Sequence, residues 1–478
     1  MAKRALILLL ALLVILDIGY SFLQHYSMPF DGDMAGGIVP ANDVKTVLEN
    51  PLGLKVFSDH VSYPNPNRFF CHWSFYEYFN RAPHLFQIFT DPINSAYLSC
   101  ALAKTLIQAT ILFLLAFFIS GSVFNLEFWL AAVIITPLFQ TNGYCRYMGI
   151  IDPATTYTFF YALPIILVLV YFLPLINNYF YHERLKRFRY LRYFWIPLAL
   201  ITSLSGPLNP GIALVVGLLL LWNAFWPNLK RVTATNPFAR LWYAAVKVPK
   251  YYYFYLLPIG IFSMYSLLLG RFNSIDLDNQ MPLLKLYARL PEGIFYTFFQ
   301  KLGFPILLVV LAINTIIINK KASNDDGKKI VNAFKWIGIF SLVYILLLPL
   351  GGYRPYRLNV LRYDTIIPIT LCLVFIFGKT TLFLIKNLSK KQLAWYVPLI
   401  AVVLFIFANA DTAKFGKNEA ERKAIQEISQ SSESVVPINS SCTVLSWILI
   451  ADPQESKLNS ELLKRWGIVK DDKLYYQK

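Results

Sequence analysis

Long apolar stretches alternate with short polar segments along almost the whole chain. Many approach the roughly 20 residues that a helix needs to cross the hydrocarbon core of a bilayer, and several are shorter. We distinguish such stretches at 5–24, 96–120, 127–141, 155–176, 194–206, 208–226, 252–269, 303–319, 336–350, 365–384 and 395–410. The pattern predicts an all-α polytopic membrane protein with about eleven transmembrane helices within residues 1–410.

The fifth and sixth stretches are separated only by residues 206–211, which read Gly-Pro-Leu-Asn-Pro-Gly. Proline and glycine cannot continue a regular helix there. The segment 194–226 is therefore either two short spans or one broken, re-entrant helix.

The composition agrees with a membrane location. Of the 478 residues, 56% are hydrophobic and 15% are charged, whereas soluble proteins are about 25% charged. The net charge of +17 does not indicate nucleic-acid binding, because the basic residues form short clusters between apolar stretches, as in cytoplasmic loops. The five cysteines show neither CxxC spacing nor a disulfide framework.

The placement of Lys and Arg predicts the orientation. Lys3 and Arg4 precede the first stretch, which favours a cytoplasmic N-terminus. Alternation from there places the later basic clusters inside and the C-terminus outside; these clusters lie at 184–192, 230–250, 320–335 and 379–391. We therefore expect a multi-pass protein of a cell membrane, specifically a bacterial inner membrane. Cleavage of the first stretch as a signal peptide would leave this orientation unchanged.

Two extracytoplasmic regions are large enough to carry chemistry. They are a long first loop, 25–94, and a small C-terminal segment, 411–478. In the C-terminal segment we expect helices at about 417–430 and 455–466, with a strand near 443–450 between them.

The first loop opens on Asp31-Gly32-Asp33. Because Gly32 frees the backbone, both carboxylates can converge on one point. Such a pair can hold a divalent cation such as Mg²⁺ or Mn²⁺, or one member can take a proton from an acceptor hydroxyl. An ordinary Asp-Gly turn is the alternative.

Farther along the first loop, Arg68 and His72 come before an aromatic stretch, 73–89, which we expect to lie as a helix in the membrane interface. Four of the five histidines lie in this loop, but their spacing matches no zinc-ligand pattern. The second outer loop adds Arg146 and Asp152 as candidate functional residues.

A late outer loop carries Arg354, Arg357 and Arg362, although short outer loops normally avoid arginine. Arginine binds phosphate in a bidentate way and stays charged, and interleaved tyrosines such as Tyr353 can stack on a sugar. Alternatively, these arginines pair with outer acidic residues such as Asp364, or contact lipid headgroups.

Two charges lie inside predicted spans. Asp17 and Lys104 each fall about 12 Å below the outer surface, on consecutive antiparallel helices. Buried charges in a membrane need partners, so the sequence predicts a structural Asp17–Lys104 ion pair, with a proton or ion relay as the alternative.

The cytoplasmic start, the long first outer loop that opens on acidic residues, the spans and the outer C-terminal segment together resemble the GT-C glycosyltransferases. These membrane enzymes take a sugar from a polyprenyl-phosphate carrier. In that family an acidic residue or Asp-x-Asp-like pair in the first outer loop is the catalytic base or metal ligand, and Asp31 and Asp33 are the matching positions. Later outer loops often bind the donor phosphate through Arg or Lys, for which Arg354, Arg357 and Arg362 are candidates by position.

The resemblance implies transfer of a sugar to a glycan, lipid or protein acceptor by single displacement, with inversion. A carboxylate deprotonates the acceptor, and cations stabilise the charge that grows on the departing phosphate. One base suffices because phosphate leaves without a general acid, in contrast to glycoside hydrolysis, which usually needs two carboxyl groups.

Three other functions are compatible with the sequence. A transporter or lipid-linked-saccharide flippase would place functional charges near the midplane and carry inverted repeats, which we do not find. A polysaccharide polymerase or ligase usually has its large outer loop late in the chain, whereas the longest internal outer loop here is the first. A non-catalytic membrane assembly subunit is compatible with every feature described above.

Overall fold

The computed structural model describes residues 2–181, 193–232, 236–278, 281–352, 359–413 and 415–477. Within these ranges nine helices are long and apolar enough to cross a membrane, which confirms a polytopic, helical membrane protein. They are α1 (Ala2–Tyr26), α6 (Pro92–Ser120), Thr155–Tyr181, α11 (Asn209–Arg231), α13 (Lys250–Gly270), α17 (Gly303–Lys321), α18 (Asp325–Leu347), α19 (Ile367–Asn387) and α20 (Lys390–Ala410). The helix Thr155–Tyr181 contains α8 (Thr155–Tyr157), a π turn and α9 (Leu163–Tyr181).

Two of the predicted spans are shorter helices. The first is α7 (Leu126–Ile135), which one 3₁₀ turn extends to Leu138. The second is α10 (Trp195–Ser203), whose nine residues rise about 14 Å, roughly half of the hydrocarbon core. The prediction of a helix over 194–206 is therefore correct in type, but α10 by itself is too short to cross.

The break between α10 and α11 is held by specific contacts. The Asn209 side-chain amide donates to the carbonyl oxygens of Thr202 (2.9 Å) and Pro164 (3.0 Å), which bridges the two sides of the break. A Cβ on Gly206 would lie 2.7 Å from the Cβ of Pro164, so only glycine allows this close approach. The predicted interruption is thus present at residues 204–208, whereas Asn209, Pro210 and Gly211 form the first turn of α11.

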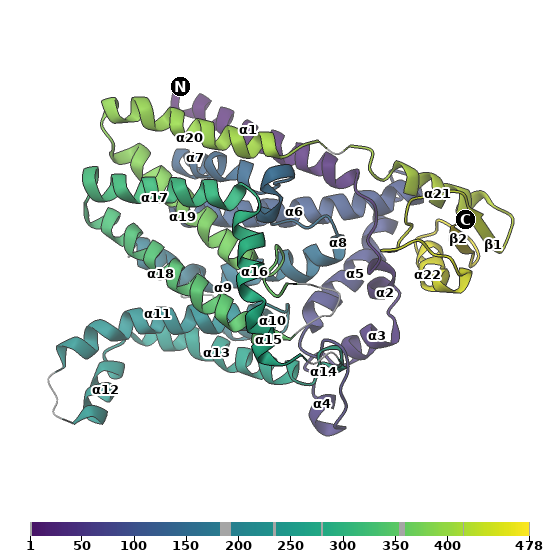
Figure 1. Ribbon diagram of the computed structural model, residues 1–478, viewed down its shortest axis with the longest axis horizontal. Coiled ribbons are helices and arrows are strands. Elements are labelled where there is room, and N and C mark those ends of the chain that lie inside the picture. Colours follow the sequence, from purple (N-terminus) through teal and green to yellow (C-terminus); the bar gives the residue numbers. More distant parts are fainter. Residues whose placement is uncertain are drawn as a thin grey trace.

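The helices lie side by side, and two contacts fix the direction of α9 relative to α6 (Figure 1). At the end of α9, the Tyr181 hydroxyl donates to the carbonyl of Ile119, near the end of α6 (2.6 Å). At the opposite end, Lys104 of α6 donates to the carbonyl of Pro153, just before α8 (2.6 Å). The two helices therefore run in the same direction, and the chain that joins them returns along the bundle through α7.

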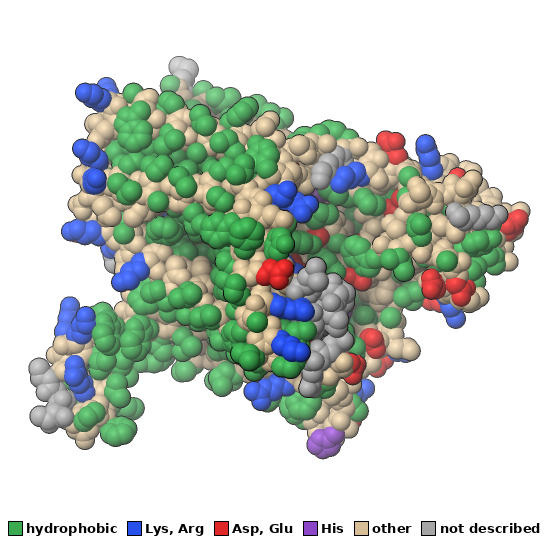
Figure 2. Space-filling view, viewed as in Figure 1, with side chains coloured by type: hydrophobic (Ala, Val, Ile, Leu, Met, Phe, Trp, Pro, Cys, Tyr) green, Lys and Arg blue, Asp and Glu red, His purple; other side chains and the backbone are tan. Residues whose placement is uncertain are grey.

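The bundle has a buried centre and an apolar rim. In the most apolar 18-residue stretch of α19, 83% of the residues are buried. The corresponding share in α1 is 11%, and Leu8 of that helix is 69% exposed. Figure 2 shows apolar side chains over much of the visible face of the bundle. Such a surface suits a lipid environment, where apolar side chains need no cover from water.

The two ends of the bundle differ in charge. The end on the left of Figures 1 and 2, where α17 meets α18 and α19 meets α20, carries many Lys and Arg side chains, and we call it the basic end. At the opposite end, the loop end, residues 27–91 and the C-terminal segment 415–477 pack together. The first of these contains α2 (Met34–Ile38), α3 (Asn42–Glu49), α4 (Lys55–Ser58) and α5 (Phe69–Phe86).

The aromatic stretch of the first loop is helical, as predicted, and forms α5. Four further short helices occupy other connections: α12 (Pro237–Val246), α14 (Ser274–Asp278), α15 (Leu283–Ala288) and α16 (Leu290–Ile294).

The C-terminal segment is a small α/β unit with α21 (Glu419–Gln430), β1 (Val435–Ile438), α22 (Lys457–Arg465) and β2 (Leu474–Gln477). The two strands pair in parallel, with Val435 opposite Leu474. Both predicted helices are present, but the predicted strand at 443–450 is wrong. Leu445 has φ of +49° there, a left-handed conformation that an extended strand does not contain. The segment packs against the first loop through Trp466, whose indole N–H donates to Phe79 O (3.1 Å).

Candidate functional site

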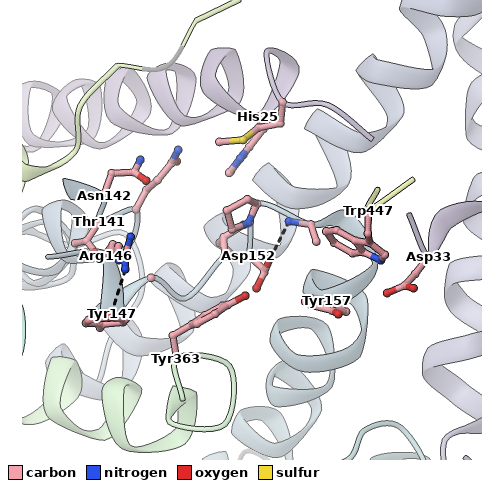
Figure 3. Close-up of a pocket in the computed structure, with 16 residues that line it drawn as sticks. His25, Asp33, Thr141, Asn142, Arg146, Tyr147, Asp152, Tyr157, Tyr363 and Trp447 are labelled. Atoms are coloured by element: carbon pink, nitrogen blue, oxygen red, sulfur yellow. Dashed lines mark hydrogen bonds between the residues drawn. The ribbon is translucent and has the colours of Figure 1, made fainter. Parts of the chain in front are cut away.

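A cavity of about 900 Å³ opens at the loop end, between the helix bundle and the C-terminal segment. The side chains around it come from segments far apart in the sequence (Figure 3), and the chemically informative ones are Asp33, Arg146, Asp152, Tyr157, Tyr363 and Trp447. A large concave site with a few charged groups among aromatic side chains is the usual form of a small-molecule site.

The two aspartates of the first loop have separate surroundings. Asp33 is exposed and lines the cavity. Asp31 is buried, and its two carboxylate oxygens accept hydrogen bonds from the backbone N–H (2.9 Å) and the hydroxyl (2.6 Å) of Thr156. Only Asp33 is therefore placed to meet a substrate, and the expected convergence of both carboxylates is wrong.

Asp31 instead fixes the position of the Asp31–Asp33 turn. Thr156 lies in the first turn of the helix Thr155–Tyr181, where free backbone N–H groups and the helix dipole favour a negative charge. Burial raises the pKa of Asp31, and the hydrogen bonds from Thr156 act against that rise. The turn that presents Asp33 is thus tied to the end of a long helix.

The predicted Mg²⁺ or Mn²⁺ site does not fit this arrangement. Both oxygens of Asp31 already bind Thr156, so Asp31 and Asp33 do not offer a shared set of free ligands. Across the described ranges, no group of three or more His, Cys, Asp or Glu side chains is placed to hold a metal ion.

Asp152 forms part of the cavity wall between Arg146 and Asp33 (Figure 3). Its carboxylate accepts from the backbone N–H of Ala154 (2.7 Å), and the Tyr363 hydroxyl points toward it. Burial raises the pKa of Asp152 to about 6, while the Ala154 hydrogen bond and the nearby charge of Lys104 act against that rise. Asp152 therefore changes its charge close to neutral pH.

The predicted Asp17–Lys104 ion pair is wrong. Both residues lie in the described part of the chain, yet no ion pair joins them, and Lys104 donates to Pro153 O below the cavity. The helix register explains the difference. Gln108 of α6 bonds Ser21 (2.9 Å) and His25 (3.2 Å) of α1, so Lys104, one turn nearer the loop end, lies beyond Asp17.

Asp17 occupies a different small pocket, of about 100 Å³, which it shares with Tyr20 and Asp411. This pocket lies between α1, the turn after α7 and the end of α20. Asp17 and Lys104 thus belong to separate polar clusters.

Arg146 is the exposed cation of the cavity. Its guanidinium lies over the ring of Tyr147, 5.1 Å from the centroid, and donates to the Tyr147 hydroxyl (3.2 Å). Tyr147 in turn donates to the side-chain oxygen of Gln300 (2.7 Å). No carboxylate of the described ranges pairs with Arg146, so its charge is available to an anionic ligand.

The other predicted site residues that the structure describes do not line this cavity. Arg362 forms an ion pair with Asp364, which is the structural alternative for that loop, although the adjacent Tyr363 does reach the cavity. Arg354, Arg357 and Tyr353 lie outside the described residues.

Arg68 and His72 belong to the packing around α5. His72 is buried with its ring edge-on to Phe160, at 4.6 Å between centroids. Burial and the charge of Arg68 lower the pKa of His72 to about 3, so the ring stays neutral. These two residues support the fold near the break after α10, where Phe70 N–H bonds Leu204 O (3.1 Å).

The residues that sequence reasoning missed are aromatic. Tyr157 follows the end of the second outer loop, and Trp447 lies in the C-terminal segment at the position expected to be a strand. The Trp447 ring lies 5.9 Å from that of Tyr157 at 32°. The apolar run that contains Trp447, within a largely polar C-terminal segment, is the signal in the sequence that could have drawn attention to this position.

No protein-family model, curated protein or solved structure matches the chain.

Proposed function

We propose that this chain is a membrane glycosyltransferase of the GT-C type, which moves a sugar from a polyprenyl-phosphate donor to an acceptor at the loop end. The observation that carries the proposal is the cavity, which combines the cation Arg146, for which the described part of the chain supplies no carboxylate partner, with the carboxylates of Asp33 and Asp152. Its place at the end of an apolar bundle suits a substrate whose lipid lies in the bilayer and whose sugar lies at the surface.

In this mechanism, Arg146 binds the donor phosphate and stabilises the negative charge that grows as phosphate leaves. Asp33 accepts the proton of the acceptor hydroxyl. The acceptor oxygen bonds to the anomeric carbon while the bond from that carbon to the phosphate oxygen breaks. The products are the glycosylated acceptor with inverted configuration, polyprenyl phosphate and one proton.

Asp31 and Asp152 take supporting roles in this proposal. Asp31 is occupied by Thr156 and positions the turn that carries Asp33. Asp152, whose pKa is raised to about 6, accepts hydrogen bonds from hydroxyl groups of the donor sugar, and Tyr363 lies beside it in the cavity wall.

We further propose eleven crossings, with the basic end in the cytoplasm. Tyr181 contacts Ile119 at the basic end, whereas Leu204 accepts from Phe70 at the loop end, so these two residues lie at opposite ends of the bundle and we count one crossing between them. We also count α7 as a crossing, because α6 ends at the basic end and Pro153, which follows α7, lies at the loop end. An odd number places the N-terminus inside and the C-terminal segment outside, in agreement with the basic clusters.

The test uses the purified full chain, a panel of polyprenyl-phosphate sugars and a panel of glycan, lipid and peptide acceptors, and it measures release of polyprenyl phosphate. Asp33→Asn and Arg146→Gln should each lower turnover about 100-fold or more. Arg81→Gln is the control, because Arg81 is exposed on α5, pairs with Glu77 and does not line the cavity. Full activity in both cavity variants, or no release by the wild type with any donor, would contradict the proposal.

A transporter is the second candidate, and one observation favours it. Asp17 lies within α1 and shares a pocket with Asp411, and transporters place carboxylates at such depths. An Asp17→Asn variant separates the two functions. If Asp17→Asn still releases polyprenyl phosphate, the enzyme is supported. If the wild type takes up a solute into proteoliposomes and Asp17→Asn does not, the transporter is supported.

A further inference from the structure

Trp447 begins a short exposed apolar stretch, in which Ile448 is 69% and Leu449 is 49% exposed, and buried residues flank this stretch on both sides. The Trp447 side chain is 53% exposed and lines the cavity, whereas Val444, Leu445 and Ile450 are each at most 3% exposed. Large aromatic side chains normally lose most of their exposed surface on folding. The C-terminal segment therefore presents this ring to the cavity.

The backbone that carries Trp447 packs closely against the Asp31–Asp33 turn. A Cβ on Gly32 would lie 2.5 Å from the backbone nitrogen of Trp447, so glycine is required between Asp31 and Asp33 for this contact. Leu445, two residues earlier, has a left-handed φ of +49°, which is strained for a branched side chain. Strained backbone of this kind persists where the surroundings enforce it, and it occurs preferentially at functional sites.

A buried carboxylate enforces that conformation. One oxygen of Glu421 accepts from the N–H of Leu445 (3.1 Å), and the other accepts from the N–H of Phe30 (2.8 Å) and the hydroxyl of Tyr97 (2.7 Å). Glu421 thus joins the loop that carries Trp447 to the loop that carries Asp33. The two side chains are positioned as one unit.

We propose that Trp447, Tyr157 and Asp33 form the acceptor subsite of the cavity and that the acceptor is an uncharged saccharide. The inference rests on the transferase function proposed above. The C–H groups on the face of a pyranose ring are attracted to the negative face of an aromatic ring. A carboxylate beside that ring accepts hydrogen bonds from the sugar hydroxyls, and it is also the group that removes the proton of the attacking hydroxyl.

The distribution of charge separates this subsite from the donor end. In Figure 3, Arg146 and Tyr147 lie on one side of the cavity, and Trp447, Tyr157 and Asp33 lie on the other, with Asp152 between them. Arg146 is the one cation among the described lining residues, so the phosphate belongs at its end. The negative charge of Asp33 disfavours an anionic acceptor at the other end.

Binding without any donor tests the subsite directly. The wild-type chain in nanodiscs is titrated with a set of uncharged oligosaccharides, including β-linked glucose and N-acetylglucosamine disaccharides, and the dissociation constants are measured calorimetrically. For a saccharide that binds, Trp447→Ala should weaken affinity at least tenfold, and Trp447→Phe should weaken it less. Trp73→Ala is the matched control, because Trp73 is 48% exposed on α5 and outside the cavity lining.

Three outcomes would overturn the assignment. They are the absence of measurable binding to every saccharide in the set, equal affinities of wild type and Trp447→Ala, and strong quenching of Trp447 by brominated lipids, which would place the ring in the bilayer. Saccharide binding that depends on Trp447 in a chain that releases no polyprenyl phosphate would support the subsite while contradicting the transferase reaction. The failure of one proposal is thereby distinguishable from failure of the other.

Discussion

Asp31 and Asp33 show how two identical side chains, two residues apart, acquire different roles. The buried carboxylate of Asp31 is fully used by Thr156, whereas that of Asp33 faces the cavity. A carboxylate whose oxygens already accept good hydrogen bonds contributes to stability, while a free one at a cavity wall can accept a proton from a ligand. Burial, and not residue type, separates the two.

This difference predicts opposite effects for two conservative variants. In Asp31→Asn, the amide NH₂ group faces one of the two Thr156 donors, so we expect a loss of about 1–3 kcal/mol in the free energy of unfolding. Asp33→Asn should unfold like the wild type and lose sugar transfer. Thermal unfolding in detergent, combined with the release assay, measures both properties. Equal melting temperatures for Asp31→Asn and wild type would contradict the assigned role of Asp31.

The sequence identified the Asp31–Asp33 pair by its position after the first span, but it could not predict which member is free. That distinction depends on Thr156, which folding brings to Asp31 from another part of the chain. Trp447 was missed for a similar reason, since its place in the cavity depends on contact with Gly32. Local sequence patterns carry no information about such long-range contacts.

At the scale of elements, the long helices were predictable because each is marked by an apolar run of suitable length. The prediction failed where tertiary contacts override local preference. The apolar run at 443–450 looks like a strand, yet Leu445 is held in a left-handed conformation by Glu421. The strands that do form, β1 and β2, pair across a long connection that no local pattern reveals.

The contact of the C-terminal segment with the first loop should depend on pH. Burial, together with the negative charge of Asp31, raises the pKa of Glu421 to about 7 from an ordinary value near 4.5, against the opposing hydrogen bonds of Phe30, Leu445 and Tyr97. The folded state therefore binds this proton more tightly than the unfolded state. The stabilisation is complete below pH of about 4.5 and is lost as pH rises through about 7.

We therefore expect the melting temperature of the wild type, relative to Glu421→Gln, to fall between pH 5 and pH 8. Asp152 titrates in the same direction, but it is present in both proteins, so the difference isolates Glu421. Glu427→Gln is the control on the same helix, since Glu427 is exposed, and it should keep the wild-type dependence. A pH dependence that persists unchanged in Glu421→Gln would contradict this role.

At the scale of the whole molecule, charge and chemistry are separated along the bundle. The basic end gathers Lys and Arg, while the loop end gathers the cavity, the first loop and the C-terminal segment. Positive loops are retained in the cytoplasm during membrane insertion. In the orientation that we propose, the candidate site faces outward, where a polyprenyl-phosphate sugar would present its sugar.

Cysteine labelling measures this orientation. Lys470 of the C-terminal segment and Lys328 near the start of α18 are both exposed, so each can be replaced by Cys in a Cys442→Ser background. A membrane-impermeant maleimide should label Lys470→Cys in intact spheroplasts and Lys328→Cys only after permeabilisation. The proposed arrangement requires this result because three crossings, α18, α19 and α20, lie between the two positions. Labelling of Lys328→Cys alone from outside would place the cavity on the cytoplasmic side and exclude an outward-facing transferase. Labelling of both positions from outside would contradict the proposed number of crossings.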